Sequence, residues 1–531
     1  MAVDQRKKII YLAVVLVVLY SSTMRQVLDT NVDRFPSKRK RVQEHLYSGE
    51  STIMPEQFMD AEQLRRQVGR DVRQAWQFLR FHLLNLSSSN LDLGALLEDL
   101  GHSFRVTSHD LARLAEVDEL QEWRRREAAA LSALVQHRLR VLQNPRDCAS
   151  AKKIYCDFTG PGRGIGSQLH HLSYCFLASY GTQRTLILNT KNFNGNPRGL
   201  DTFFLPLSDT CTTYNHSQMV LWPGKDESSV VLFPAMDRPR PRPSYFPKSV
   251  PKDISERLVR LHGDPFAWWI GQFFKYSMRM SKEFQEYIEN LAQKIGYESP
   301  VVGLQIRRTD KLISEAAYVS LEVYMEEVED FYQELELHQP VAQRKIFLAT
   351  DDPEIIPEMK KKYPEYKVVY HKASLDSTPK KKRKSESSLR YFLADIYFLS
   401  RSDYLVCGMT SNICRLAYEL MQALHPDASD RASSVDREYF FHYEGGDVAE
   451  ARFPHKPRRP LEMELRKGDL VDRRDIPSNF VKHPSKRDGF QWGRNTRTKR
   501  RGFYPVFKTI EKMRVADVKS FEHIDKMNKS P

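Results

Sequence analysis

Three cationic side chains follow an apolar, strand-like segment near the middle of the chain. Arg307, Arg308 and Lys311 come directly after Val301–Ile306, and Glu315 follows in the same loop. Guanidinium and ammonium groups gathered where a strand ends form a pocket for an anion such as a diphosphate. A carboxylate beside them can take a proton from a hydroxyl group. This pattern favours an enzyme that holds a diphosphate leaving group without a metal while it deprotonates an alcohol.

The four side chains would divide this work among them. Adjacent residues at the end of a strand point apart, so we expect Arg307 to bind the phosphate and Arg308 to support it. Glu315 is the candidate base, and Lys311 would orient it. The alternatives are that both arginines form surface ion pairs and that Glu315 is only a solvated loop residue.

The segment 301–424 alternates between two kinds of pattern. Hydrophobic, β-branched strand patterns and amphipathic helical patterns take turns, which predicts an α/β fold with a parallel sheet covered on both faces. Ligands of such sheets bind at the carboxyl ends of the strands, where Arg307, Asp351 and Thr410 fall. The predicted strands are Val301–Ile306, Lys345–Thr350, Tyr366–His371 and Tyr404–Met409, and the helices are Leu321–Leu337, Pro353–Lys362, Ser387–Ser400 and Ser411–Leu424.

Further candidates for ligand binding lie around this sheet. Asp351 and Asp352 follow a strand, where paired carboxylates suit a metal, ribose hydroxyls or guanine N–H groups; with three cations nearby we invoke no metal. Asp395 lies within an apolar helical pattern, where an unpaired carboxylate is costly, so it needs a donor from guanine, a core arginine or the backbone. The Gly-rich segment Gly162–Gly166 precedes a helix, and its amides can receive phosphate or a sugar, although such a motif is weak by itself.

The amino-terminal end carries a membrane signal. Arg6, Lys7 and Lys8 precede the uncharged segment Ile9–Met24. Basic residues on this side predict a single anchor at 9–24, a cytoplasmic tail at 1–8 and a lumenal remainder, with a cleaved signal peptide as the alternative. The net charge of +14 favours anionic partners, but a lumenal chain is not expected to bind nucleic acid.

The regions before and after the α/β segment differ in composition and in hydrophobic pattern. Residues 25–58 are polar and predict a flexible stem. Apolar residues between Leu64 and Leu83 and between Leu131 and Leu142 recur at helical spacing, so 59–145 predicts a helical stem, either a dimeric coiled coil or helices packed on the following domain. Short β-like runs at 444–512 predict a small β-barrel, followed by a tail at 513–531. The six cysteines suggest disulfides in an oxidising lumen, and their spacing leaves 15 connectivities open.

Specific motifs occur in a fixed order at Asp147–Cys148, Gly166–His171, Tyr180–Leu188, Leu261–Pro265, Arg307–Lys311, Ala349–Pro353, Cys414–Glu419, His425–Ser429 and Gly502–Pro505. Together they closely resemble the α1,6-fucosyltransferases that add core fucose to N-glycans (glycosyltransferase family 23). The resemblance spans roughly Cys148 to Lys512, and the amino-terminal layout is similar as well.

The resemblance implies a type II Golgi membrane enzyme that transfers fucose from GDP-fucose to O6 of the innermost GlcNAc of an N-glycan. The reaction would proceed with inversion and without a metal or another cofactor. The implied architecture is a GT-B-like catalytic domain at 146–440 with a Rossmann-type donor half at 300–435, a coiled-coil stem and a carboxy-terminal SH3-like β-barrel. A homodimer through the stem helices and the SH3-like domain is also implied.

The resemblance also assigns individual residues. Arg307 matches the arginine that binds the β-phosphate, Glu315 the catalytic base and Lys311 its assistant. Other matches to positions for donor binding or activity are Arg308, Asp310, Asp351, Asp352, Asp395 and Ser411, with Gly164 and Gly166 in the Gly-rich loop. The implied disulfides are Cys148–Cys211, Cys156–Cys175 and Cys407–Cys414.

This chain departs from the family pattern on the donor side. A histidine that contacts guanine is replaced by Gln305, a donor-site tyrosine aligns near Gly195, and a glutamine after Ser411 is Asn412. A short disulfide across the Gly-rich loop is lost, with Arg163 and Ser167 at its two positions. These departures affect GDP-fucose affinity more than the chemistry, and they favour as the alternative a catalytically weak or inactive glycan-binding relative.

Overall fold

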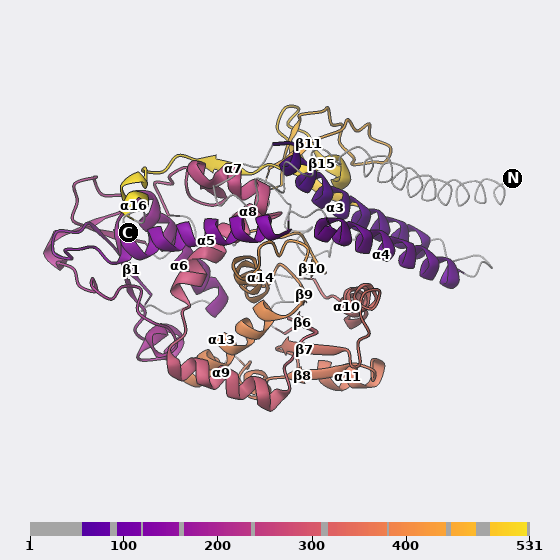
Figure 1. Ribbon diagram of the computed structural model, residues 1–531, viewed down its shortest axis with the longest axis horizontal. Helices are drawn as coiled ribbons and strands as arrows, with labels where there is room; N and C mark the ends of the chain where they lie inside the picture. Colours follow the sequence, from indigo (N-terminus) through magenta and orange to yellow (C-terminus); the bar gives the residue numbers. More distant parts are fainter. Residues whose placement is uncertain are drawn as a thin grey trace.

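A computed structural model describes residues 56–84, 93–117, 121–158, 164–234, 239–309, 317–379, 382–441, 448–473 and 489–527. Two helices project from one side of the body, and two parallel sheets with their helices form the remainder, with the carboxy-terminal strands above them (Figure 1). Asp310, Lys311 and Glu315 lie outside the described residues.

The amino-terminal helices do not share one environment. Helices α3 (Glu56–Leu84) and α4 (Leu93–Val117) lie side by side, and ion pairs join them to the body, from Arg80 to Glu326 (2.7 Å) and from Arg105 to Asp330 (3.2 Å). Helix α5 (Gln121–Gln143) instead buries its apolar stripe in the largest hydrophobic core of the described residues. For α5, packing on the following domain is therefore the alternative that holds, while a dimeric coiled coil through the helix that contains Leu64–Leu83 remains a prediction. Helix α4 was not predicted.

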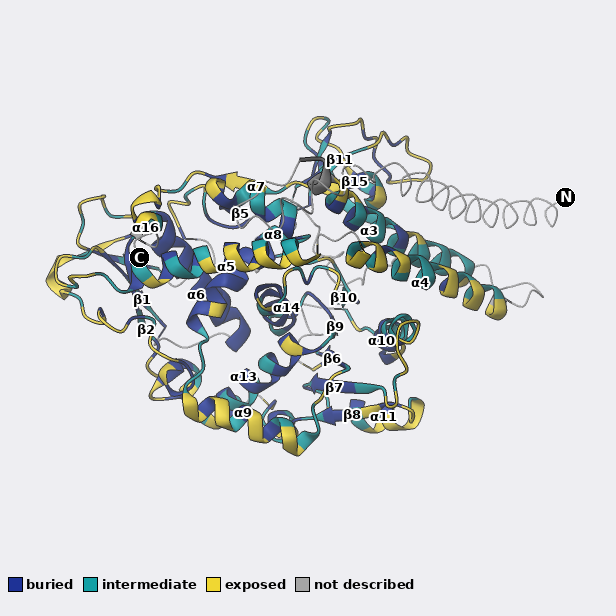
Figure 2. Cartoon of the chain, in the orientation of Figure 1, coloured by how far each residue is buried: buried dark blue, intermediate teal, exposed yellow. Residues whose placement is uncertain are grey.

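The first sheet is parallel and has the strand order β2-β1-β4-β3. Its strands are β1 (Lys153–Asp157), β2 (Thr185–Asn189), β3 (Met219–Leu221) and β4 (Val230–Phe233). The crossover helix α6 (Ile165–Thr182) is buried along almost its whole length, because it packs against strands β1 and β2 and against helices α8 and α14 (Figure 2). Disulfides Cys148–Cys211 and Cys156–Cys175 are present here and Cys407–Cys414 in the second sheet, the pairs that the resemblance implies.

The second sheet is also parallel and has the order β10-β9-β6-β7-β8. Its strands are β6 (Val301–Ile306), β7 (Lys345–Thr350), β8 (Lys367–Tyr370), β9 (Tyr404–Cys407) and β10 (Ala432–Ser434), and its helices are α10 (Leu321–Leu335), α11 (Ile355–Lys362), α12 (Lys372–Asp376), α13 (Glu386–Arg401) and α14 (Asn412–Leu424). The four predicted strands and their parallel arrangement are confirmed, and β10 is an additional fifth strand.

Helices α7 (Lys252–Leu261), α8 (Pro265–Ser277) and α9 (Lys282–Ile295) connect the two sheets. Helix α8 packs against α14 of the second sheet and against α5 and α6 of the first. Its aromatic residues, among them Trp268, Trp269 and Phe273, are fully buried. One continuous core therefore joins the two halves, and the carboxyl edge of the second sheet is held at a fixed place relative to α6.

The carboxy-terminal region forms an antiparallel sheet of order β14-β13-β12-β11-β15. Its strands are β11 (Val448–Ala451), β12 (Leu470–Asp472), β13 (Phe490–Asn495), β14 (Arg501–Pro505) and β15 (Thr509–Glu511). The chain then returns to the body: β16 (Arg514–Ala516) pairs with β5 (Ser249–Pro251), and α16 (Glu522–Met527) places Asp525 2.7 Å from Arg138 of α5. The predicted β character is confirmed, whereas an SH3-like barrel remains a prediction.

The prediction of a single-pass Golgi membrane protein has to be corrected. Within the described part of the chain, none of the helices combines the length and the apolar character that a membrane crossing needs. The longest of these helices, α3, carries charged residues throughout its 29 residues. The segment 9–24, on which the anchor prediction rested, lies outside the described residues, as do 1–8 and 25–55.

Candidate functional site

The carboxyl ends of neighbouring strands β6 and β7 bring Arg307 next to Asp351. Arg307 Nε lies 3.4 Å from Asp351 Oδ2, and the Arg307 side chain is 28% exposed while that of Asp351 is only 1% exposed. Asp351 also accepts hydrogen bonds from the backbone N–H groups of Arg308 (2.8 Å) and Thr309 (3.2 Å) and from the Thr309 hydroxyl. A guanidinium tethered on a carboxylate and still partly exposed at this edge suits the recognition of an anion.

Arg308 forms ion pairs, as the alternative interpretation of this arginine expects, and its supporting role in the site stays a prediction. Its guanidinium lies 3.4 Å from Glu358 and 3.7 Å from Asp352, and it donates to the carbonyl of Val319 at 3.3 Å. It also lies over the ring of Tyr318, 4.7 Å from the centroid. Arg308 is only 9% exposed, and through these contacts it links the end of β6 to Tyr318 and Val319, which precede α10.

Asp352 stands at the start of helix α11. Its Oδ1 accepts the backbone N–H of Glu354 at 3.1 Å, and its own N–H donates to the Thr350 hydroxyl at 3.1 Å. The two adjacent aspartates therefore do different work: Asp351 organises the loop after β6, while Asp352 organises the turn before α11 and pairs with Arg308.

Ser411 lies where β9 gives way to α14. It is buried, its N–H donates to the carbonyl of Gly408 at 2.9 Å, and its own carbonyl accepts from Arg415 in the first turn of the helix. The N-terminus of this helix presents backbone N–H groups toward the carboxyl edge of the sheet, which favours an anionic ligand there.

The described end of the Gly-rich segment, from Gly164 to Gly166, lies against this same helix end. Gly164 stands directly before α6, and Gly166 lies in its first turn. A Cβ on Gly166 would lie 2.8 Å from Asn412 Cβ, so only glycine permits the two helix N-termini to approach this closely. Arg163 lies outside the described residues, and Ser167 is buried.

Asp395 occupies a buried polar cluster near the carboxyl end of β8. Its Oδ2 accepts from the Ser374 hydroxyl, its Oδ1 lies 3.9 Å from His371 Nδ1, and neither of these last two atoms has a hydrogen-bond partner among the described residues. Burial raises the pKa of Asp395 to about 8, and burial lowers the pKa of His371 to about 4. Buried polar atoms without a partner are unusual, so this cluster can receive a ligand with N–H groups.

The three positions where the chain departs from the family pattern all lie among the described residues. Gln305, at the end of β6, is 5% exposed, and its Oε1 has no hydrogen-bond partner among the described residues. Gly195 adopts φ +79°, and a Cβ there would lie 2.9 Å from the carbonyl oxygen of Lys384. Asn412 accepts a hydrogen bond from Arg415 through its side-chain oxygen.

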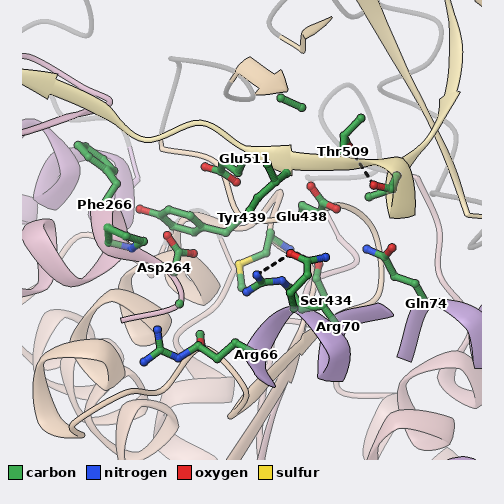
Figure 3. A pocket seen from close by; sticks show the side chains of 18 of the residues that line it. Arg66, Arg70, Gln74, Asp264, Phe266, Ser434, Glu438, Tyr439, Thr509 and Glu511 are labelled. Carbon is green, nitrogen blue, oxygen red and sulfur yellow. Dashed lines mark hydrogen bonds between the residues drawn. The ribbon is translucent and has the colours of Figure 1, made fainter. Parts of the chain in front are cut away.

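A separate cavity of about 510 Å³ lies where α3, the catalytic region and the carboxy-terminal sheet meet (Figure 3). Its charged side chains pair across elements: Arg66 with Asp427 (2.9 Å), Lys248 with Glu511 (3.4 Å), and Arg473 with Glu438 (2.5 Å). Asp264 faces Tyr439 and Glu511 in this cavity, and burial, reinforced by Glu511, raises its pKa to about 7. The cavity is a junction between three parts of the fold. Arg307, Asp351 and Asp395 do not line it, but it reaches the end of the second sheet through Met409, Ser434 and Asp436.

The structure therefore brings together the candidates that follow strands. Arg307, Arg308, Asp351, Asp352 and Ser411 share one edge of the second sheet, and Gly166 reaches it from the first half. Three candidates, Asp310, Lys311 and Glu315, cannot be placed because they lie outside the described residues.

Sequence reasoning did not find Asp436, which lies two residues after β10 at this edge. Its carboxylate binds Thr410 of the neighbouring loop. The predicted alternation of strands and helices ended at Leu424, and the three-residue strand β10 is too short and too polar to give a pattern. An aspartate that follows a short β-branched or serine-rich run could have served as a signal.

Comparisons with known proteins agree with these motifs. A family model for the N- and catalytic domains of alpha-(1,6)-fucosyltransferase matches residues 15–440. The chain is 38% identical over 472 residues to an alpha-(1,6)-fucosyltransferase of Drosophila melanogaster, across 86% of this chain and 74% of that relative. It is 31% identical over 444 residues to an alpha-(1,6)-fucosyltransferase of Caenorhabditis elegans, across 82% of this chain and 76% of the relative.

A crystal structure of the fucosyltransferase NodZ from Bradyrhizobium is a more distant match, with 13% identity, a TM-score of 0.30 and coverage of 50% of this chain and 92% of that one. This distant likeness adds nothing to the assignment. The family model and the two relatives, each covering more than four fifths of the chain, suffice by themselves. The resemblance seen in the motifs is thus confirmed, and the chain belongs to the alpha-(1,6)-fucosyltransferase family.

Proposed function

We propose that this protein transfers fucose from GDP-fucose to O6 of the innermost GlcNAc of N-glycans, with inversion and without a metal ion. Family membership supports the fucose transfer. The observation that carries the proposal for the site is Arg307, tethered to Asp351 and partly exposed at the carboxyl edge of a parallel sheet, where ligands of such sheets bind.

In the proposed reaction, the Arg307 guanidinium neutralises charge on the β-phosphate as the bond between fucose C1 and the phosphate oxygen breaks. The acceptor O6 forms the new bond to C1 from the opposite face, and Glu315 takes its proton. GDP leaves with the electron pair of the broken bond. Lys311 would hold Glu315 ionised and add positive charge, so the cations of this loop would do the work that a metal does in other transferases.

We further propose that the buried cluster around Asp395 receives the guanine. The support is a carboxylate oxygen without a partner among the described residues, held by Ser374 beside the end of β8. Guanine N1–H and its amino group are donors that such a carboxylate accepts. Gln305, whose Oε1 is buried and likewise unsatisfied in the described part of the chain, is a second group of the kind that a base can satisfy.

The test is a transfer assay with the full chain, GDP-[¹⁴C]fucose and an agalacto biantennary glycopeptide, read by label and by mass spectrometry. We expect a mass gain of one deoxyhexose on the innermost GlcNAc and no product on a glycopeptide already fucosylated at O6. Excess EDTA should leave the rate unchanged, whereas a loss restored by added metal would overturn metal independence.

Two variants assign the proposed roles. Glu315→Gln should abolish transfer while GDP still binds, and Arg307→Lys should weaken GDP binding as well. Arg257→Gln, at an exposed position on α7 that forms an ion pair with Glu127 far from the sheet edge, is the matched control and should behave as the parent. Full activity in Glu315→Gln would remove Glu315 from its proposed role.

The alternative is a glycan-binding relative with weak or no transfer. The observation that favours it is the set of donor-side departures, Gln305, Gly195 and Asn412. Calorimetric titration with GDP decides between the two, because an active enzyme should bind GDP and the alternative requires no detectable binding at millimolar nucleotide.

We propose two finer points of architecture. The two parallel halves joined by α8 support a GT-B-like arrangement with 300–435 as the donor half, and the antiparallel sheet at 448–511 supports an SH3-like domain. A homodimer through the stem helices and the SH3-like domain rests on the family resemblance. Leu64 and Leu84 of α3, each at least half exposed, lie about 30 Å apart on different sides of the helix and so probe two of its faces. Light scattering on the Leu64→Glu/Leu84→Glu variant should then show a monomer.

A further inference from the structure

Two loops at the carboxyl edge of the second sheet each contain a threonine that is hydrogen-bonded to an aspartate from a neighbouring loop. After β6, Asp351 accepts the backbone N–H and the hydroxyl of Thr309. After β9, Asp436 accepts the backbone N–H (3.2 Å) and the hydroxyl (2.5 Å) of Thr410. In each case the carboxylate comes from the loop after an adjacent strand, β7 for the first and β10 for the second. We call these two contacts the threonine clasps.

The hydrogen bonds of Asp436 leave it little freedom to move. Its Oδ2 is occupied by Thr410, and its Oδ1 accepts from the Ser434 hydroxyl at 3.0 Å and from the N–H of Arg437 at 2.7 Å. A carboxylate that accepts several short bonds from one loop fixes that loop, since bonds to a charged acceptor are stronger than neutral ones.

Gly408 shows how closely the second clasp approaches the chain. A Cβ at this position would lie 2.6 Å from Asp436 Oδ2, a distance that real Cβ atoms do not adopt. The loop after β9 and the Asp436 carboxylate are therefore fitted to each other on both sides of Met409.

The strand order explains why the pair matters. β9 and β6 are neighbours at the centre of the sheet, with β10 outside one and β7 outside the other. The clasps therefore hold the two central loops from their outer sides. One loop carries Arg307, and the other carries Ser411 and leads into the α14 N-terminus, which touches Gly166.

We propose that Asp436 is a positioning residue for donor binding: through Thr410 it fixes Ser411 and the α14 N-terminus relative to Arg307, as Asp351 fixes Arg307 through the loop after β6. The inference rests on the proposed function, because it assigns to Asp436 a part in holding the nucleotide sugar. In this proposal Asp436 acts through Thr410 and not on the donor itself, so its removal should change donor affinity more than the chemical step.

The experiment compares Thr410→Val, which keeps the shape but removes the hydroxyl, with Thr410→Ser, which keeps the hydroxyl, and with Asp436→Asn. We expect Thr410→Val and Asp436→Asn to raise KM for GDP-fucose and Kd for GDP by about 10-fold, the effect of losing one hydrogen bond to a charged acceptor. kcat should stay within about 2-fold, and Thr410→Ser should restore the parent values.

A double variant and a matched control separate positioning from general stability. If the two groups act through one contact, Asp436→Asn/Thr410→Val should raise KM no further than the larger single change. The control is Asp469→Asn in the carboxy-terminal sheet, where the carboxylate accepts from Arg466, Asn495 and Arg497 at 2.6–2.9 Å. It should lower the melting temperature and leave KM unchanged.

Each outcome supports or overturns the positioning role. Unchanged KM and Kd in Thr410→Val, or a loss of kcat at unchanged KM, would overturn it while the parent enzyme stays active. A parent protein that binds no GDP would overturn the proposed function and this inference with it. If Asp436→Asn does not fold, the comparison of Thr410→Val with Thr410→Ser still tests the contact by itself.

Discussion

The carboxyl edge of the second sheet and the junction cavity are both rich in charge, but they use it differently. At the sheet edge, Asp351 and Asp436 direct their oxygens to backbone N–H groups and threonine hydroxyls, and Arg307 is left partly exposed. Asp436 also lines the junction cavity, so the two regions meet at this residue. At the junction, guanidinium and carboxylate groups pair with one another across elements, as Arg473 does with Glu438 and Glu511. The first arrangement holds loops in place for a ligand, and the second holds three parts of the fold together.

The largest effect should come from Arg307. Arg307→Ala should lower kcat/KM by about 10³-fold or more, because charge stabilisation of the leaving diphosphate is lost. The melting temperature should change little, since the side chain is 28% exposed. Arg473→Ala at the junction should do the opposite and lower the melting temperature while kcat stays near the parent value. Equal loss of activity in both variants would contradict the distinction between the two regions.

Arg308 combines features of the sheet edge and of the junction cavity. It belongs to the sheet edge, yet it is buried and paired with Asp352 and Glu358 like a junction residue. Arg308→Ala should therefore reduce both properties, with a loss of about 10- to 100-fold in kcat/KM and a lower melting temperature, because two carboxylates lose their partner. Thermal unfolding and steady-state kinetics on the same preparation check this, and a purely kinetic effect would contradict the bracing role.

The sequence predicted the framework of this edge well. β6 and β7 have the predicted bounds, because the sequence of a buried parallel strand is a continuous run of hydrophobic residues with polar residues at both ends. It also gathered Arg307, Asp351 and Thr410 at one edge, since parallel strands end on the same side. These conclusions need only local pattern and the rule for strand ends.

Contacts between segments far apart in the chain were beyond that reasoning. Asp351 was expected as a donor ligand, but its oxygens are engaged by the backbone of the loop after β6, a fact that depends on the order of strands in the sheet. Asp436 was not predicted, because β10 is short and because its pairing with β9 joins two segments that a helix and a loop separate in the sequence. The close approach of Gly166 to Asn412 likewise depends on how the two halves dock.

Asp395 predicts a pH dependence of donor binding. Burial holds its pKa at about 8, so below pH 8 the carboxyl is protonated in the empty site. Guanine N–H groups favour the ionised form, so binding GDP should release a proton. GDP affinity should rise by more than about 10-fold between pH 6 and pH 8 and level off only above about pH 9, where the empty site is already ionised. Calorimetry in two buffers of different ionisation enthalpy measures the released proton. Asp395→Asn should bind more weakly with no such dependence, and an affinity that falls toward pH 8 would contradict the assignment.

Asp264 predicts a smaller effect, on stability rather than on binding. Burial, with Glu511 nearby, raises its pKa from 3.8 to about 7, so between these values the folded protein holds a proton that the unfolded chain has lost. The free energy of unfolding contributed by this group is fully present below pH 4 and is lost as the pH rises through 7, by about 1–3 kcal/mol.

Denaturant unfolding at pH 5 and pH 8 should therefore show a smaller fall in the free energy of unfolding for Asp264→Asn than for the parent. Glu511→Gln should also reduce the fall, because the like charge that opposes ionisation of Asp264 is gone, and kcat should be unchanged in both variants. A parent protein whose stability rises between pH 5 and pH 8 by more than that of Asp264→Asn would place Asp264 among the ordinary ionised carboxylates of the junction.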